Sequence, residues 1–140
     1  MAKNPVVTIS AAIIGAVVGY WVVNHTLHGP ASTHQFLIEA ADAANKKLPM
    51  MVDSETRWDK TEVGADGRNV LIYDYTLPNV IKNQVDVASL QKMMRIQLVQ
   101  NYKTSDVMQA LRDRGVELDY KYVDKNGDLV FEQDISPKDF

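Results

Sequence analysis

The chain has 140 residues, of which 46% are hydrophobic and 24% charged, and its formal net charge is −3. This composition excludes a disordered tail, a low-complexity chain and a strongly basic nucleic-acid binder. The lack of cysteine excludes a disulfide scaffold, a thiolate metal site and a cysteine nucleophile. Residues 1–29 carry one charged side chain, Lys3, and residues 30–140 carry all the others. We therefore expect a membrane anchor in residues 1–29, with a short cytoplasmic N-terminus, and one soluble domain in residues 30–140.

The anchor is predicted from an uncharged apolar run over residues 6–23. As a helix it would span roughly 27 Å, close to the thickness of the hydrocarbon core of a bilayer. Lys3 precedes the run, Tyr20 and Trp21 lie near its far end, and all three are residue types that membrane interfaces favour. The next Lys or Arg lies well inside the domain, so the positive-inside rule predicts a single-pass protein of the bacterial inner membrane with a periplasmic domain. A cleaved signal peptide, with a weak cleavage site at residues 29–31, is the alternative.

Small residues recur every four positions within this run, at Ala11, Gly15 and Gly19. Such a stripe lets a second helix approach closely, which predicts self-association or packing on the transmembrane helix of a partner. The alternative is the ordinary abundance of Gly and Ala in membrane helices. The run carries no ionisable residue, which excludes a proton relay along this helix alone.

Hydrophobic periodicity predicts three helices and four strands in the domain. In chain order they are a helix over 33–48, strands over 55–63 and 70–77, helices over 86–101 and 105–114, and strands over 116–122 and 129–135. Turn-forming residues within 64–69 and 124–128 join the strands into two hairpins. The predicted fold class is α+β: an N-terminal transmembrane helix, then a four-stranded antiparallel sheet of two hairpins packed with about three helices.

Two short patterns suggest metal binding but fail on spacing. His25, His28 and His34 cluster after the apolar run, yet no further ligand stands at metal-site spacing, so we interpret them as polar residues near a membrane interface. Residues 124–128 begin like a calcium loop, but the sixth position lacks glycine and the twelfth lacks glutamate. We interpret that segment as a hairpin turn, and we expect neither a metal nor a cofactor.

No catalytic motif is present, and no histidine follows His34, which excludes a Ser–His triad within the domain. Four carboxylates alternate along the last two predicted strands: Glu117, Asp119, Glu132 and Asp134. Their alternation predicts a solvated sheet face. The alternative is one exposed acidic patch through which an inhibitor-type protein blocks an envelope enzyme.

The tyrosines at Tyr73 and Tyr75 and at Tyr120 and Tyr122 share an i, i+2 spacing, so each pair lines one face of its own strand. This pattern indicates either a candidate binding face for a peptide or glycan, or a sheet face covered by the helices. Cross-strand aromatic pairs commonly stabilise sheets, which favours the core interpretation.

Several segments together resemble small exported or membrane-tethered bacterial α+β proteins of unknown function: residues 48–57, residues 73–77 and residues 115–127. The resemblance covers residues 36–139 and implies export but no catalytic residues. Such proteins often carry cysteines at the positions of Tyr102 and Phe140, so the bridge between these positions that the resemblance implies is absent here.

Together these patterns predict a non-enzymatic, single-span envelope protein whose domain acts as an interaction or accessory subunit of a membrane complex. The expected partners are the membrane, other envelope proteins and a second copy of the chain, and not nucleic acid. A tethered ligand-binding or sensory module is the alternative, and an inhibitor or immunity-type protein is a further one.

Overall fold

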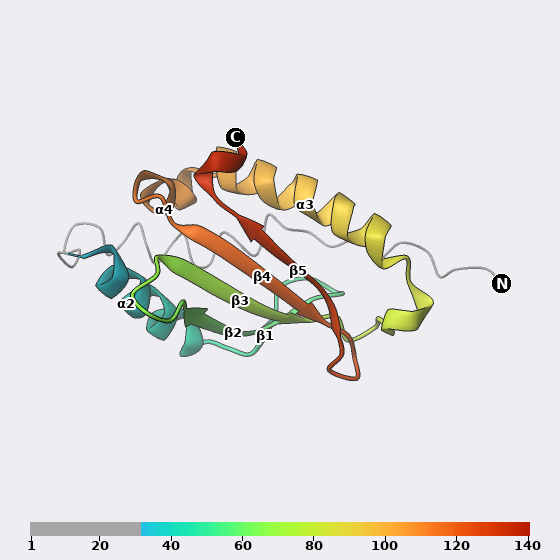
Figure 1. The fold of residues 1–140 in the computed structure, drawn as a ribbon. Helices are drawn as coiled ribbons and strands as arrows, with labels where there is room; N and C mark the ends of the chain where they lie inside the picture. The colour runs from blue at the N-terminus through green and yellow to red at the C-terminus, as the bar shows by residue number, and fades with distance from the viewer. Residues whose placement is uncertain (1–31) are drawn as a thin grey trace.

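The computed structural model describes residues 32–140, and the elements follow one another along a single sheet (Figure 1). They are α2 (Thr33–Asn45), β1 (Met50–Met51), β2 (Arg57–Val63), β3 (Val70–Thr76), α3 (Val87–Thr104), α4 (Gln109–Asp113), β4 (Glu117–Val123) and β5 (Leu129–Ile135). The 3-10 turns η2 (Lys82–Gln84), η3 (Asp106–Met108) and η4 (Pro137–Asp139) lie in the connections and at the C-terminus.

Side-chain caps fix where the two longer helices begin. The Ser32 hydroxyl accepts a hydrogen bond from the Gln35 amide, and the Asp86 carboxylate accepts one from the Ser89 amide. Each cap satisfies a backbone N–H that has no partner within the helix. The sequence predicted both of these starts.

The five strands form one mixed sheet in the order β1-β2-β3-β4-β5. The two predicted hairpins are confirmed, since β2 pairs antiparallel with β3 and β4 with β5. The strands β3 and β4, however, run parallel, and β1 adds a two-residue strand at the edge. The predicted four-stranded antiparallel sheet is therefore wrong. The connection over residues 77–116 contains α3 and carries the chain back to the other end of the sheet, as a parallel crossover requires.

The predicted fold class also included an N-terminal transmembrane helix. That helix lies outside the described residues. Over residues 32–140 no helix has both the length and the apolar character needed to cross a bilayer. The predicted fold class is thus replaced by a five-stranded mixed sheet with three α-helices on the part of the chain that the structure describes.

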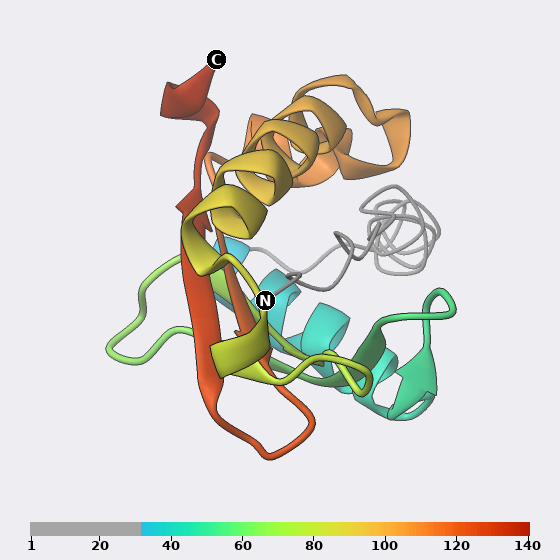
Figure 2. The same ribbon diagram turned by 90° about the vertical axis from the view of Figure 1, so that its right-hand side faces the viewer.

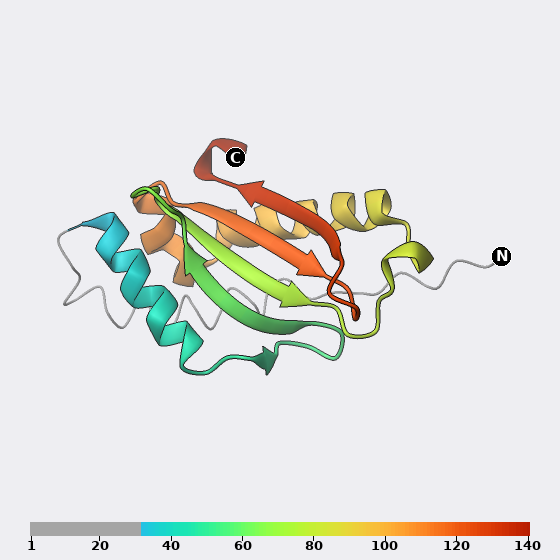
Figure 3. The same cartoon turned by 60° about the horizontal axis from the view of Figure 1, so that its bottom comes forward.

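The helices all lie on one side of the sheet, as the edge-on view makes clear (Figure 2). Helix α2 packs against β2, where the Asn45 amide group bonds both the N–H and the C=O of Thr61 at 2.8 Å. Helix α3 lies along β5, and the Gln91 carbonyl oxygen accepts a hydrogen bond from the Gln133 side chain at 2.8 Å. None of the described helices lies over the other side of the sheet, and we call that side the open face (Figure 3).

Two rows of aromatic rings in contact cross the face of the sheet that the helices cover. Neighbouring rings lie 4.7–5.9 Å apart between centroids along the series Trp58, Tyr73, Tyr120, and along the series Tyr75, Tyr122, Phe131. These rings anchor a core to which α2 contributes Phe36 and Leu37 and α3 contributes Met94 and Leu98.

Tyr102 and Phe140, the positions at which the resemblance implied cysteines, lie against each other. Their ring centroids are 5.8 Å apart and their planes nearly perpendicular, an edge-to-face contact. The Tyr102 hydroxyl also donates a 2.7 Å hydrogen bond to the Val116 carbonyl oxygen. An aromatic contact therefore joins α3 to the C-terminus in this chain.

Candidate functional site

The open face carries a candidate site that combines a pocket with a cluster of carboxylates. The alternation of β4 and β5 directs their charged residues to this face and their aromatic residues to the core. Asp119 of β4 lies directly opposite Asp134 of β5. Glu132 precedes Asp134 by two residues, so both side chains point to the same side of β5. One oxygen of each carboxylate lies within 4.8 Å of the other two. We call these three residues the acidic cluster.

Asp119 is the buried member of the acidic cluster. Its side chain is 9% exposed, although it sits on a face with no helix over it. Its Oδ1 atom is buried and accepts no hydrogen bond from any residue within 32–140. Burial, followed by the neighbouring carboxylates of Glu132 and Asp134, raises the pKa of Asp119 to about 8. The cluster is therefore a site where negative charge is crowded and poorly solvated.

A second group of charged residues on the open face contains lysines beside its carboxylates, whereas no lysine or arginine within residues 32–140 forms an ion pair with the acidic cluster. Glu62 of β2 forms an ion pair of 2.6 Å with Lys60, which lowers the pKa of Glu62. Its neighbour Asp74 has a pKa raised by burial and by Glu62, but it stands in register with Lys60 on one side and Lys121 on the other. Asp119 instead stands between Ile72 and Asp134.

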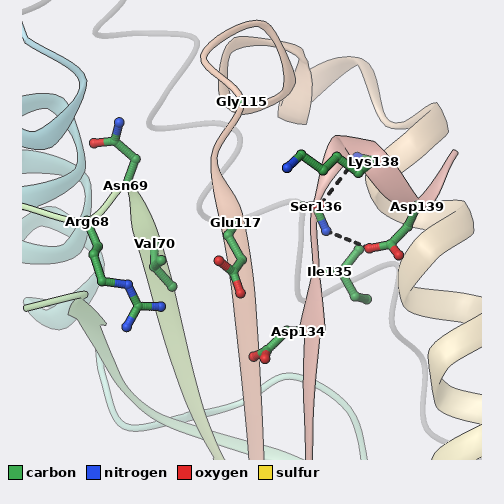
Figure 4. A pocket seen from close by; sticks show the side chains of 10 residues that line it. All are labelled: Arg68, Asn69, Val70, Gly115, Glu117, Asp134, Ile135, Ser136, Lys138 and Asp139. Carbon is green, nitrogen blue, oxygen red and sulfur yellow. Dashed lines mark hydrogen bonds between the residues drawn. The ribbon is translucent and has the colours of Figure 1, made fainter.

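A pocket of about 410 Å³ adjoins the acidic cluster and shares Asp134 with it (Figure 4). Its walls come from the starts of β3 and β4, the end of β5 and the C-terminal turn. The charged residues among them are Arg68, Glu117, Asp134, Lys138 and Asp139. A pocket lined by both signs of charge is suited to polar contacts with a charged side chain or peptide.

The C-terminal turn η4 holds one wall of the pocket in place. The Asp139 carboxylate accepts a hydrogen bond from the Ser136 amide, and the Ser136 hydroxyl accepts one from the Lys138 amide (Figure 4). Arg95 of α3 reaches over the edge of β5 to pair with Asp139 at 2.9 Å. This ion pair connects α3, on the covered face of the sheet, to the turn that forms one wall of the pocket on the open face.

The structure places the four predicted binding-face tyrosines in the core. Tyr73, Tyr75, Tyr120 and Tyr122 are each no more than 1% exposed, which leaves no surface for a peptide or glycan. The core interpretation, which the sequence left open beside the binding face, accounts for them. Burial is also the first cause that raises their pKa values.

The remaining predicted site residues all precede residue 32, where the described part of the chain begins. The small-residue stripe of Ala11, Gly15 and Gly19 and the interface residues Lys3, Tyr20 and Trp21 lie outside the described residues, as do His25 and His28. The predictions of helix packing, of self-association through that helix and of membrane-interface contacts therefore stay predictions. Residues 124–128 form a turn with Gly127 at a φ of 85°, which confirms the hairpin interpretation.

The sequence analysis did not predict that Asp119, Glu132 and Asp134 come close enough together to bind one ligand. The sequence predicted a solvated face from the alternation of these carboxylates, and Glu132 and Asp134 are indeed exposed. The available signal was the hairpin turn, because its position sets the register that places Asp119 opposite Asp134.

Comparisons with known proteins bear on the fold and the family. The sequence model of a family described as a domain of unknown function (DUF8479) matches residues 32–131. No curated protein matches the chain.

Three solved structures share the fold. A candidate secreted protein of Pseudomonas aeruginosa has a TM-score of 0.61 and 17% identity over 74% of this chain and 88% of that one. The pilotin EpsS of the Vibrio vulnificus type 2 secretion system has a TM-score of 0.60 and 11% identity, over 76% and 89%. The type II secretion pilotin AspS of Vibrio cholerae has a TM-score of 0.59 and 9% identity, over 77% and 92%. At these identities the likeness is one of fold.

Proposed function

The chain belongs to the DUF8479 family, and from its fold we propose that it is a non-enzymatic accessory protein that binds another protein of a bacterial envelope complex. The observation that carries the proposal is the extent of the likeness to the two pilotins. It covers about nine-tenths of each pilotin, so the whole fold is shared and not one supersecondary motif. Both pilotins belong to type II secretion systems.

The chemistry of the site supports binding over catalysis. The acidic cluster and the pocket contain carboxylates, an arginine and a lysine, but no histidine or cysteine that would activate a nucleophile. The pocket is open to the surface along strands that no helix covers (Figure 4). Such a surface fits a polar, partly basic segment of a partner, because negative charge prevails on β4 and β5.

Site-specific photo-crosslinking in native membranes tests this proposal. A photo-reactive residue replaces Glu117 on the wall of the pocket, and a second variant carries it at Ile96, which is 65% exposed on α3. We expect the variant at position 117 to capture a defined envelope protein, identified by mass spectrometry, and the variant at 96 to capture none. Capture by neither variant would contradict the accessory function, and capture at 96 alone would move the binding surface to the helix side.

A second function, inhibition of an envelope enzyme, is supported by the exposed carboxylates Glu132 and Asp134, which lie on the same side of β5. The same crosslinking experiment separates the two functions. A captured subunit of an assembly supports the accessory role, whereas a captured enzyme whose activity falls when the purified chain is added supports inhibition.

A further inference from the structure

The acidic cluster has the composition and spacing of a cation site. Two adjacent strands supply its three carboxylates, with Asp119 and Asp134 directly opposite each other. Like charges placed opposite on neighbouring strands destabilise a sheet. A bound cation between them would reverse the sign of that interaction.

An unpartnered buried oxygen gives an independent indication of a ligand. The Oδ1 atom of Asp119 is buried and accepts no hydrogen bond from the described residues, and the side chain is more than nine-tenths buried. Buried polar atoms in folded proteins almost always have a partner, because an unmet acceptor loses its hydration without compensation. The neighbours of Asp119 across the sheet are Ile72 and Asp134, and among the described residues neither side chain donates a hydrogen bond to its Oδ1 atom.

The cations of the protein itself do not neutralise the acidic cluster. In the described part of the chain, the ion pairs join Arg57 to Asp59, Lys60 to Glu62 and Arg95 to Asp139. Lys121 stands opposite Glu132 in the strand register, but it makes no ion pair with the cluster in the described residues. The Glu62–Asp74 group on the same face has such a pair, so the missing charge is particular to the cluster.

The ligand atoms and their spacing select the type of cation. Carboxylate oxygens are the ligands of hard divalent ions. Two oxygens on one ion lie no farther apart than twice the metal–oxygen distance, which is about 4.2 Å for Mg²⁺ and about 4.6–5.2 Å for Ca²⁺. The three oxygens lie within 4.8 Å of one another, which is nearer to the span of a Ca²⁺ site than to that of a Mg²⁺ site. The exposed sides of Glu132 and Asp134 leave room for the water molecules that complete its coordination.

We infer that Asp119, Glu132 and Asp134 form a binding site for a hard divalent cation, Ca²⁺ above all, on the open face of the sheet. This inference does not depend on the proposed function, because it rests on the geometry of β4 and β5. Three protein ligands and an open side correspond to a weak site, with a Kd of about 0.1–1 mM, in the range of extracellular calcium modules.

Calorimetry and thermal unfolding of the full chain, with Ca²⁺ alone as the added ligand, test the site. We expect binding with a Kd in the stated range and a rise in Tm of about 5 °C at roughly tenfold excess over Kd. The variant Asp119→Asn should weaken binding about tenfold or more, because it removes the buried charged ligand. The matched control Asp74→Asn removes a carboxylate of the same face outside the acidic cluster and should leave the Kd unchanged.

Two further measurements locate the ion and guard against a misfolded variant. Paramagnetic Mn²⁺ should broaden the amide signals of residues 119, 132 and 134 before those of residues 62 and 74. The variant Glu132→Gln changes an exposed side chain, so it should fold normally and still lower the affinity. The absence of heat and of a Tm shift with Ca²⁺, or equal loss of binding in Asp74→Asn and Asp119→Asn, would overturn the site.

Discussion

At the scale of single residues, Asp124 shows how one carboxylate can organise a turn through hydrogen bonds. Its Oδ1 atom accepts hydrogen bonds from the Asn126 and Asp128 amides, and its Oδ2 atom accepts one from the Lys82 amide at 2.9 Å. These bonds, the one from Lys82 first, hold the pKa of Asp124 below its usual range. The residue thus fastens the β4–β5 turn to the segment that leads into α3.

The lowered pKa of Asp124 predicts a contribution to stability with a definite pH dependence. A carboxyl group with a lower pKa in the folded state stabilises the fold above its unfolded pKa of about 4, and this contribution is lost as the pH falls through the folded pKa. We therefore expect Asp124→Asn to lower the free energy of unfolding at neutral pH, because an amide cannot accept from Lys82 with its NH₂ group. The difference from the wild type should shrink as the pH falls from about 5 to about 2.

Urea unfolding across this pH range measures the effect of Asp124→Asn. The variant Asp128→Asn serves as its control, since the exposed Asp128 side chain accepts none of the hydrogen bonds in the turn. The control should follow the wild type at every pH. A constant difference between Asp124→Asn and the wild type from neutral to acidic pH would contradict the role assigned to the charge.

At the scale of elements, the long crossover between β3 and β4 depends on contacts between α3 and the start of β4. The Tyr102 hydroxyl donates to the Val116 carbonyl oxygen, and both groups are buried. In contrast, the buried hydroxyls of Tyr73, Tyr75 and Tyr122 have no hydrogen-bond partner among the described residues. Removal of the hydroxyl group should therefore change the free energy of unfolding differently for Tyr102 and for the other three tyrosines.

We expect Tyr102→Phe to reduce the free energy of unfolding by about 1–2 kcal/mol, because it leaves a buried carbonyl group without a donor. Tyr73→Phe should be neutral or slightly stabilising, because it removes a buried polar group that has no partner. Both substitutions keep the ring and its packing, so the comparison isolates the hydroxyl group. Chemical denaturation of the two variants checks this prediction, and an equal loss in both would refute the distinction between them.

The elements were largely predictable from the sequence, whereas the way in which they join was not. Alternation places Tyr73 and Tyr120 on the inner face whether their strands run parallel or antiparallel, because alternate side chains share a face in either case. The pattern therefore determines which face of the sheet each side chain occupies, but not whether the two strands run parallel or antiparallel. A long connection containing a helix was the available signal for a parallel pair. The hairpin turn sets the register of β4 against β5, so the pairing of Asp119 with Asp134 was predictable, whereas the spacing of the three carboxylate oxygens was not.

At the scale of the whole molecule, the sheet separates two chemical environments. Helices α2 and α3 lie over one face (Figure 2), which is filled with aromatic rings, and the other face carries charged residues, a pocket and the acidic cluster. A single buried layer must then stabilise the entire fold, so the open face is free to carry charge. The charge crowding around Asp119 is tolerated because the core on the opposite face holds β4 and β5 in register.

We expect residues 32–140 to fold without residues 1–31. The core residues of the described chain lie between Phe36 and Ile135, and the family match begins at residue 32. Removal of residues 1–31 also removes Trp21, so fluorescence then reports on the fully buried Trp58 alone. The shortened chain should show blue-shifted emission and one cooperative urea transition, coincident with that of its circular dichroism, with an m-value of about 1–2 kcal/mol/M. Emission typical of a solvated indole, or two transitions that do not coincide, would mean that residues 1–31 belong to the same folding unit as the sheet.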